Sequence, residues 1–233
     1  GLNIKGKTEP VPAYRVLRAK PRPGRLRGIS GLDSPLVGRE QEMQRLRDAI
    51  TQLLAGHGQI ISIIGEAGLG KSRLVAEMRR ALAALIGDGS HAGEILWFEG
   101  RSLSYETTTP FAALSHLLRG AFALPGADSD LVYADLQARL AALAPATAPF
   151  IATLLGIQPS DEDDERVKYL EPPVLRHAIL QAVHTLVRTW ARTRPLVLVF
   201  DDIHWIDPTS LDLLEQLLPL TAEAPLLIIA LYR

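Results

Sequence analysis

The sequence predicts a three-layer α/β fold, in which helices cover both faces of a parallel sheet. Short apolar segments rich in β-branched residues alternate with longer segments in which apolar residues recur at helical spacing. A glycine-rich turn links the first short segment to a helix, and two aspartates follow the third. With 47% hydrophobic and 22% charged residues, the 233-residue chain can bury a large core.

Strands and helices are expected to alternate along the chain. Helical spacing of apolar residues begins at Met43, and Gly56 and Gly58 end that helix. Strands are expected at Gln59–Ile64, Ile95–Glu99, Leu196–Phe200 and Leu226–Leu231. Further helices are expected from Lys71 to about Leu85, over most of Thr109–Trp190 with Thr109 as cap, and from Thr209 to about Leu218. The first strand is short and continuous, which is typical of a strand covered on both faces.

The long helical region is predicted to be an insertion between the second and third strands. Its acidic run, Asp161–Glu165, is expected to be a solvated loop, because its spacing fits no calcium-binding loop. The histidines at positions 57, 91, 116, 177 and 184 lack metal-ligand spacing and are expected at the surface or in the core.

The strongest functional signal is a complete G-x-x-x-x-G-K-[ST] pattern, formed by Gly65, Glu66, Ala67, Gly68, Leu69, Gly70, Lys71 and Ser72. Its glycines let the backbone turn tightly, so that consecutive N–H groups converge on an anion. The helix that begins near Lys71 adds its positive N-terminal dipole. Lys71 can reach the β- and γ-phosphates, and the Ser72 hydroxyl can ligate Mg²⁺. These residues and the next, Arg73, predict a nucleotide site.

The second half of the site is expected where Asp201 and Asp202 follow the third strand. In a parallel sheet the carboxyl ends of the strands meet at one edge, so Asp201 can approach the glycine-rich loop. Asp201 is expected to hold Mg²⁺ together with Ser72, directly or through a water. Asp202 is the candidate that orients or deprotonates the attacking water.

Four segments together resemble the STAND class of signal-transduction ATPases, which belongs to the AAA+-like group of P-loop NTPases. They are Val37–Glu40, the P-loop, Ser104–Phe111 with its Thr-Pro-Phe, and Asp201–Asp207 with its Asp-Asp-Ile-His-Trp-Ile-Asp. Such ATPases occur in MalT/LuxR-type regulators and in class III nucleotide cyclase proteins. The resemblance covers roughly residues 35–233 and implies the strand order 1-4-3-2, with a fifth strand and a lid missing.

The resemblance also implies roles for residues outside the P-loop. The residues expected against the adenine and ribose are Val37, Gly38 and Arg39. Arg233 matches the sensor arginine that faces the γ-phosphate. His204 is expected to contact phosphate or a neighbouring element, and Trp205 to pack under the helix that follows. Asp207 or Thr209 is expected to cap that helix.

The N-terminal residues are predicted to form two further segments. Leu2–Leu17 resembles the closing strand of a class III adenylate/guanylate cyclase domain, which predicts a cyclase tail at 1–19. Residues 20–35 are expected to be a basic linker rich in Pro and Gly; residues 1–30 carry a net charge of +7, against −8 for the rest. The chain begins at Gly1 and stops in an apolar run, so we expect a fragment whose ATPase domain, 36–233, is truncated at its C-terminus.

The composition argues against several function classes. A net charge of −1 argues against nucleic-acid binding over the whole surface, and the lack of cysteine excludes a disulfide scaffold and thiol catalysis. No apolar run approaches the roughly 20 residues that span a bilayer, and no signal peptide is visible. A cytoplasmic domain with no membrane partner is therefore expected.

The predicted function is an ATP-binding, Mg²⁺-dependent regulatory switch in a multidomain signalling protein, which hydrolyses ATP slowly. ATP or ADP with Mg²⁺ are the expected ligands. The expected partners are the cyclase and C-terminal helical domains of the parent chain, together with a nucleotide-dependent oligomer; no cyclase active site is present here. Two alternatives stay open: a non-catalytic scaffold that holds ADP, and a DNA-associated ATPase of the origin-loader kind, against which Asp202 and the −8 balance count.

Overall fold

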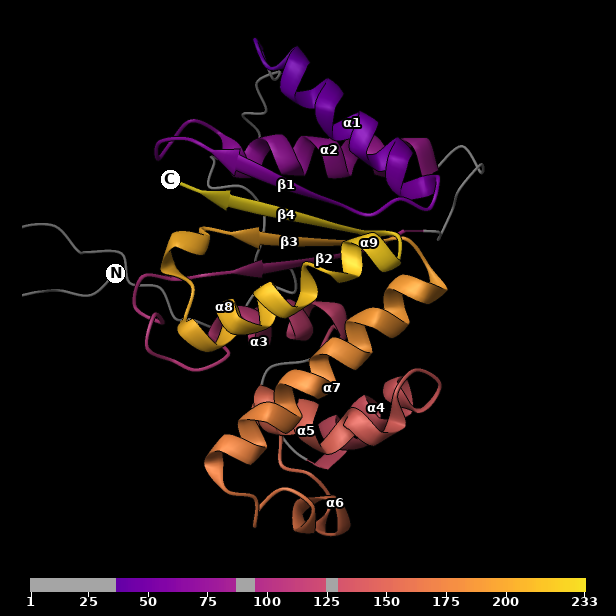
Figure 1. Ribbon diagram of the computed structural model, residues 1–233, viewed down its shortest axis with the longest axis vertical. Helices are drawn as coiled ribbons and strands as arrows, with labels where there is room; N and C mark the ends of the chain where they lie inside the picture. Colours follow the sequence, from indigo (N-terminus) through magenta and orange to yellow (C-terminus); the bar gives the residue numbers. More distant parts are fainter. Residues whose placement is uncertain (1–36, 87–94, 125–129) are drawn as a thin grey trace, which may run out of the picture. The chain divides into compact units, whose positions relative to one another are not determined.

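The computed structural model of the chain describes residues 37–86, 95–124 and 130–233. Its four strands are β1 (Gln59–Ile64), β2 (Leu96–Arg101), β3 (Leu196–Asp201) and β4 (Leu226–Tyr232). They form one parallel sheet in the order β1-β4-β3-β2, which confirms the predicted order. Figure 1 shows the strands side by side, with their carboxyl ends at the same edge. The predicted cyclase tail, linker and His91 lie outside the described residues.

The helices precede, separate and follow these strands as the sequence predicts. They are α1 (Glu40–Leu54), α2 (Lys71–Ile86), α3 (Ala112–Ala121), α4 (Asp130–Ala141), α5 (Ala148–Leu155), α6 (Asp161–Glu165), α7 (Pro172–Thr193), α8 (Pro208–Leu217) and α9 (Leu220–Glu223). Two short 3-10 turns, η1 (Pro145–Thr147) and η2 (Ile203–Trp205), complete the set in the described ranges. Helices α3 to α7 all lie between β2 and β3, which confirms the helical insertion.

The sheet separates two hydrophobic clusters, so the fold has three layers. Buried side chains of α1 and α2 pack with Val197 and Val199 of β3 on one face. Helices α3 to α5 and α7 to α9 pack with Leu198 and Phe200 of β3 on the other face. Because side chains alternate along a strand, Asp201 belongs to the same face as Val199. The alternation of β3 therefore directs the first aspartate of the pair toward the layer that contains α2.

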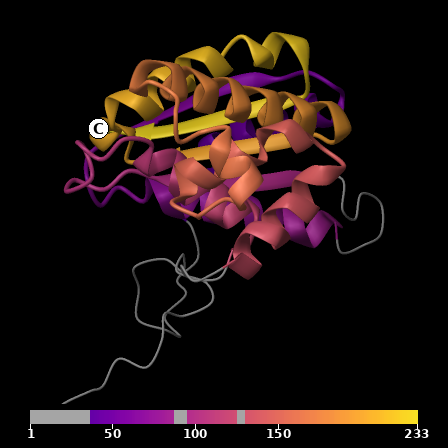
Figure 2. The ribbon, with the colours of Figure 1, turned by 90° about the horizontal axis from the view of Figure 1, so that it is seen from below.

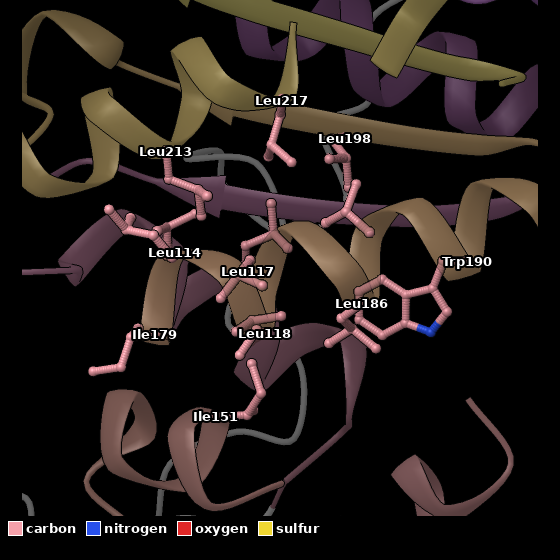
Figure 3. Packing of buried hydrophobic residues seen from close by; sticks show 14 of the residues in the cluster. Leu114, Leu117, Leu118, Ile151, Ile179, Leu186, Trp190, Leu198, Leu213 and Leu217 are labelled. Atoms are coloured by element: carbon pink, nitrogen blue, oxygen red, sulfur yellow. The ribbon is translucent and has the colours of Figure 1, made fainter. Parts of the chain in front are cut away.

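The larger cluster joins the insertion to the sheet. Figure 3 shows Leu114 and Leu117 of α3 beside Leu213 and Leu217 of α8, all of them fully or nearly fully buried. Trp190 of α7 packs against Phe98 of β2 and Phe122 at the end of α3, with ring centroids 4.8 and 5.6 Å apart. The view from below in Figure 2 places the insertion helices in front of the sheet. The insertion thus shares one core with the sheet.

Two expectations about the strands are wrong. Strand β2 continues past Glu99 to Arg101, because Arg101 still pairs in register with Asp201 of β3. Strand β1 is covered on one face only. Its Ile60 and Ile64 side chains are 49% and 64% exposed, since β1 is the edge of the sheet and neither side chain joins the hydrophobic cluster on that face.

Two expectations about the insertion are also wrong. Helix α3 begins at Ala112 rather than after Thr109, because Phe111 adopts the left-handed conformation and its N–H donates to Asp207 instead of joining the helix. The acidic run is helix α6 rather than a loop. Its acidic residues fill the first turn, where the helix dipole favours negative charge, and Asp163 accepts hydrogen bonds from Tyr133 and Gln137 of α4.

No helix within the described ranges is long and apolar enough to cross a membrane.

Candidate nucleotide site

The glycine-rich loop connects the end of β1 to the start of α2 at the carboxyl edge of the sheet. Gly68 and Gly70 have φ angles of +85° and +82°, which side chains with a Cβ rarely adopt. The loop begins against β4, because the Gly65 N–H donates to the Tyr232 carbonyl at 3.2 Å. Helix α2 opens directly behind it, with the Leu74 N–H donating to the Gly70 carbonyl. The loop therefore presents exposed backbone in front of a helix N-terminus, where an anion is favoured.

Lys71 lies against the loop that precedes it. Its Nζ donates to the Gly65 carbonyl at 2.6 Å and to the Glu66 carbonyl at 3.2 Å. These two contacts hold the ammonium group beside the exposed backbone of the loop. Positive charge from the side chain and from the helix N-terminus is therefore concentrated at one place.

Ser72 and Asp201 meet across the carboxyl edge of the sheet. The Ser72 hydroxyl donates to the Asp201 carboxylate, with Oγ 3.0 Å from Oδ2 and 3.2 Å from Oδ1. Burial raises the pKa of the Asp201 carboxyl above its ordinary value; the Ser72 hydrogen bond opposes this, and the negative charge of Asp202 adds to it. A hydroxyl and a carboxylate are the hard oxygen ligands that Mg²⁺ prefers, so this pair fits the predicted metal.

Asp202 leaves the strand in a different direction. Its backbone is left-handed, with φ 55° and ψ 43°, and it begins the η2 turn. Its Oδ2 lies 3.7 Å from Nη2 of Arg101, the last residue of β2. Asp201 and Asp202 therefore have different partners, as expected if only the first is a metal ligand.

The segment before α1 reaches the same loop. Nη2 of Arg39 is 3.5 Å from the Leu69 carbonyl, and Nη1 donates to Glu42 at 2.7 Å. Gly38 has a φ of +73° and its N–H donates to the Glu40 carboxylate. The sequence segment that the STAND resemblance assigned to the nucleotide thus lies beside the P-loop.

The comparisons with known proteins agree with this geometry. The model of the AAA ATPase domain matches residues 35–229. The chain belongs to the AAA ATPase domain family. It is also 29% identical, over 232 residues and 99% of its length, to an uncharacterized protein of Rhizobium meliloti (strain 1021), of which it covers 22%. The chain thus spans about a fifth of the length of that relative.

The remaining predicted residues of this AAA ATPase domain lie around the same edge. Arg233 follows β4, the strand between β1 and β3, and its side chain is exposed. Val37 is 78% exposed beside α1. Arg73 lies in the first turn of α2, with Nη2 3.7 Å from the Glu77 carboxylate. The topology brings Arg73 and Arg233 to the carboxyl edge, and Val37 lies two residues before Arg39, which contacts the P-loop. Contact of these three residues with a nucleotide stays a prediction.

His204 and Trp205 lie side by side in the η2 turn, and contact of His204 with phosphate stays a prediction. Both ring nitrogens of His204 are buried without a partner among the described residues. Trp205 is 38% exposed, and its ring lies 5.1 Å from that of His204. The expectation that Trp205 packs under α8 is wrong, because the η2 turn carries its neighbours Ile203 and Ile206 into the core instead.

Two residues of the site were missed from the sequence. Arg101 was overlooked because the second strand was predicted to stop two residues earlier; continuing the strand in register would have placed it opposite Asp201. Asp207 was assigned only a capping role. It does cap α8, accepting from the Ser210 N–H, but it also accepts from the Phe111 N–H, and nothing in the sequence indicates that second bond.

Proposed function

We propose that this AAA ATPase domain binds ATP and ADP with Mg²⁺ and hydrolyses ATP slowly. The observation that carries the proposal is the 3.0 Å contact between Ser72 and Asp201, two residues 129 positions apart. It joins an anion-binding loop to an acidic strand end, which is the pairing that a Mg²⁺–nucleotide complex requires.

Each residue has a distinct task in this proposal. The loop amides and Lys71 bind the phosphates, and Ser72 and Asp201 hold the metal ion, which neutralises charge on the β- and γ-phosphates. Asp202 orients the attacking water and accepts its proton. Arg233, at the end of the strand between the P-loop and Asp201, faces the γ-phosphate.

We further propose that the domain is a STAND-class regulatory switch within a larger signalling protein, of the MalT/LuxR or nucleotide cyclase kind. The Asp-Asp-Ile-His-Trp-Ile-Asp segment and its place beside the P-loop support the class. The relative is several times longer than this chain, which supports a multidomain parent. In this proposal exchange of ADP for ATP changes contacts with neighbouring domains of the parent chain or between copies of it.

The test is calorimetric titration of ATP and of ADP, with Mg²⁺, into the chain and into two variants. Lys71→Ala is expected to lose phosphate binding. Lys168→Ala is the matched control, because Lys168 pairs with Glu165 in the insertion, outside the site. Loss of binding in the first variant alone supports the proposal. Equal affinity in all three proteins contradicts the assigned phosphate site.

One contact favours a second candidate, a scaffold that holds ADP without turnover. The Arg101 guanidinium lies 3.7 Å from Asp202 and partly neutralises the carboxylate that would act on water. Measurement of phosphate release under single-turnover conditions separates the two functions. Release that depends on Asp202 supports the enzyme, whereas tight ADP binding without release supports the scaffold.

A further inference from the structure

Two loops at the carboxyl edge of the sheet are tied together at both ends. One follows β2 and spans residues 102–111; the other follows β3 and spans residues 202–207. At the strand ends, the Ser102 N–H donates to the Asp201 carbonyl at 3.0 Å. At the far ends, the Phe111 N–H donates to Asp207 Oδ1 at 2.9 Å. The first loop leads into α3 of the insertion, and the second contains Asp202, so the two ties join the acidic pair to the insertion.

Backbone strain is concentrated at the same two loops. Three non-glycine residues in the described ranges have positive φ, and two of them are Asp202 and Phe111, at 55° and 61°. This conformation costs most residues with a Cβ roughly 1–2 kcal/mol and is tolerated better by aspartate, so at Phe111 it persists only where surrounding contacts hold it. Asp202 begins one loop and Phe111 ends the other. Asp207 is the last residue of the loop that Asp202 begins, and its carboxylate accepts the hydrogen bond from the Phe111 N–H.

Unsatisfied buried polar atoms gather there as well. Five buried side-chain nitrogen or oxygen atoms lack a partner in the described part of the chain, and all belong to these loops and the first turn of α8. They are Ser102 Oγ, His204 Nδ1 and Nε2, Asp207 Oδ2 and Ser210 Oγ. Such atoms are rare in stable cores and are costly, so each of them requires an explanation.

A capping role alone does not account for Asp207. A cap of α8 needs one acceptor for the Ser210 N–H, which Oδ1 provides at 2.9 Å. The same oxygen also serves Phe111, 96 residues earlier, and the side chain is buried with only 1% of the residue exposed. Burying a carboxylate is unfavourable, and a serine would cap the helix without this cost. The second bond is therefore the feature that requires an aspartate-length side chain.

We propose that Asp207 is a positioning residue for the hydrolysis proposed above: through its bond to Phe111 it holds the two loops together and keeps Asp202 in its left-handed conformation. The inference rests on the proposed ATPase function. It also makes the start of α3, and hence the insertion, part of the machinery that places Asp202.

Three substitutions at one position separate positioning from capping. Asp207→Asn keeps an acceptor where Oδ1 lies and should retain both bonds. Asp207→Ser keeps the cap of α8, but its oxygen lies one bond closer to the backbone and cannot also reach Phe111. Asp207→Ala loses both bonds. Steady-state phosphate release, with kcat and KM for ATP measured separately, and thermal unfolding are recorded for each.

The expected result is a loss of kcat in the serine variant without a loss of the cap. Its kcat should fall at least about tenfold, because a misplacement of about 1 Å can reduce a rate by up to 100-fold. Its KM should remain that of the wild type, its unfolding temperature should fall less than that of the alanine variant because the cap of α8 is kept, and the asparagine variant should turn over ATP at close to the wild-type rate. The alanine variant should lose both kcat and thermal stability. A serine variant with wild-type kcat would overturn the proposal.

A second measurement does not depend on turnover. Residue-resolved amide hydrogen exchange compares the nucleotide-free wild type with Asp207→Ser. If the loops are coupled, exchange accelerates both at Phe111 and at the Trp205 and Ile206 amides of η2, which bond to the Asp202 and Ile203 carbonyls. Acceleration confined to Phe111 contradicts the coupling. If the wild type shows no phosphate release, the proposed ATPase function fails, and the exchange experiment still decides whether Asp207 couples the loops.

Discussion

The Ser72 hydroxyl lies 3.0 Å from Oδ2 of Asp201, and this contact joins the two halves of the candidate nucleotide site. Ser72 belongs to the first turn of α2 and Asp201 to the last position of β3. Strand β4 lies between β1 and β3, so the contact between Ser72 and Asp201 connects segments at the carboxyl ends of two strands that are not adjacent in the sheet. This arrangement depends on the strand order, because a P-loop on any other strand would lie elsewhere along the edge.

The buried charge of Asp201 is expected to lower stability when no metal is bound. Its folded pKa is raised, mainly by burial, so the folded state binds this proton more tightly than the unfolded state. Its favourable contribution is present below the ordinary carboxyl pKa and is lost as the pH rises through the raised value. In EDTA at pH about 7, Asp201→Asn should therefore unfold at a higher temperature, by roughly 2–4 °C per kcal/mol removed.

The same variant should lose its response to Mg²⁺. In the presence of ATP, increasing Mg²⁺ should raise the unfolding temperature of the wild type and leave that of Asp201→Asn unchanged. The stability difference in EDTA should shrink as the pH is lowered and the wild-type carboxyl becomes protonated. A variant that is less stable than the wild type in EDTA at neutral pH would contradict the assigned cost of burial.

Asp202→Asn is expected to slow hydrolysis without weakening nucleotide binding. The amide keeps the shape of the side chain but cannot accept the proton of water, and loss of a general base costs about 10²- to 10⁴-fold. Single-turnover phosphate release and calorimetric affinity for ATP measure the two quantities. Asp212→Asn is the control, since Asp212 pairs with Arg176 on the outer side of α8. Parallel losses of rate and affinity would assign Asp202 to binding instead.

Arg101→Gln should change the pH dependence of Mg²⁺ binding but not stability. The positive charge of Arg101 lowers the pKa of Asp201, against the larger effect of burial. Its removal raises that pKa further, so protons compete with Mg²⁺ at a higher pH. As the pH is lowered, half-maximal Mg²⁺ for ATP binding should therefore increase more steeply in the variant than in the wild type.

The control for this prediction is Arg79→Gln. The Arg79 guanidinium, on α2, pairs at 2.8 Å with Glu99 of β2, the strand that also contains Arg101. Both ion pairs are solvent-exposed and contribute about 0–1 kcal/mol, so neither variant should unfold much more easily. Identical Mg²⁺ titrations for the two variants at all pH values would rule out an electrostatic effect of Arg101 on the site.

Tyr133→Phe tests how the insertion holds its acidic helix. The Tyr133 hydroxyl donates to Asp163 at 2.6 Å, and burial raises the pKa of this hydroxyl. Although burial opposes it, hydrogen bonds from Tyr133 and Arg166 lower the pKa of Asp163. The variant should lose about 1–3 kcal/mol in urea unfolding at neutral pH, because the bond is to a charged acceptor. Tyr169→Phe, at a residue that is 76% exposed, should change stability by less than about 0.5 kcal/mol.

The pH dependence of this effect has a definite sign. The depressed pKa of Asp163 contributes stability above the ordinary carboxyl pKa, and that contribution is lost as the pH falls through the lowered value. Stabilities of the wild type and Tyr133→Phe should therefore converge in acid. A difference that is constant from neutral pH to acid would indicate packing, not the charged hydrogen bond.

Local patterns in the sequence determined most elements and the phosphate loop of this protein. Apolar runs such as Leu226–Tyr232 predict buried strands because their surroundings are apolar on both faces. The P-loop is predictable because its requirements, glycines with positive φ and a lysine at a helix start, are met within eight consecutive residues. Asp201 is predictable because strand ends in a parallel sheet share one edge.

Only the tertiary structure decided which residues meet across that edge. The exposed face of β1 follows from its position at the edge of the sheet. The local sequence around Ile60 is the same as that expected of a strand covered on both faces, so it does not predict this exposure. Arg101 reaches the site because β2 pairs with β3 to its last residue. Phe111 leaves the helical path because Asp207, far along the chain, accepts its N–H. Such contacts depend on register and on bonds between distant segments, and a local sequence pattern carries neither.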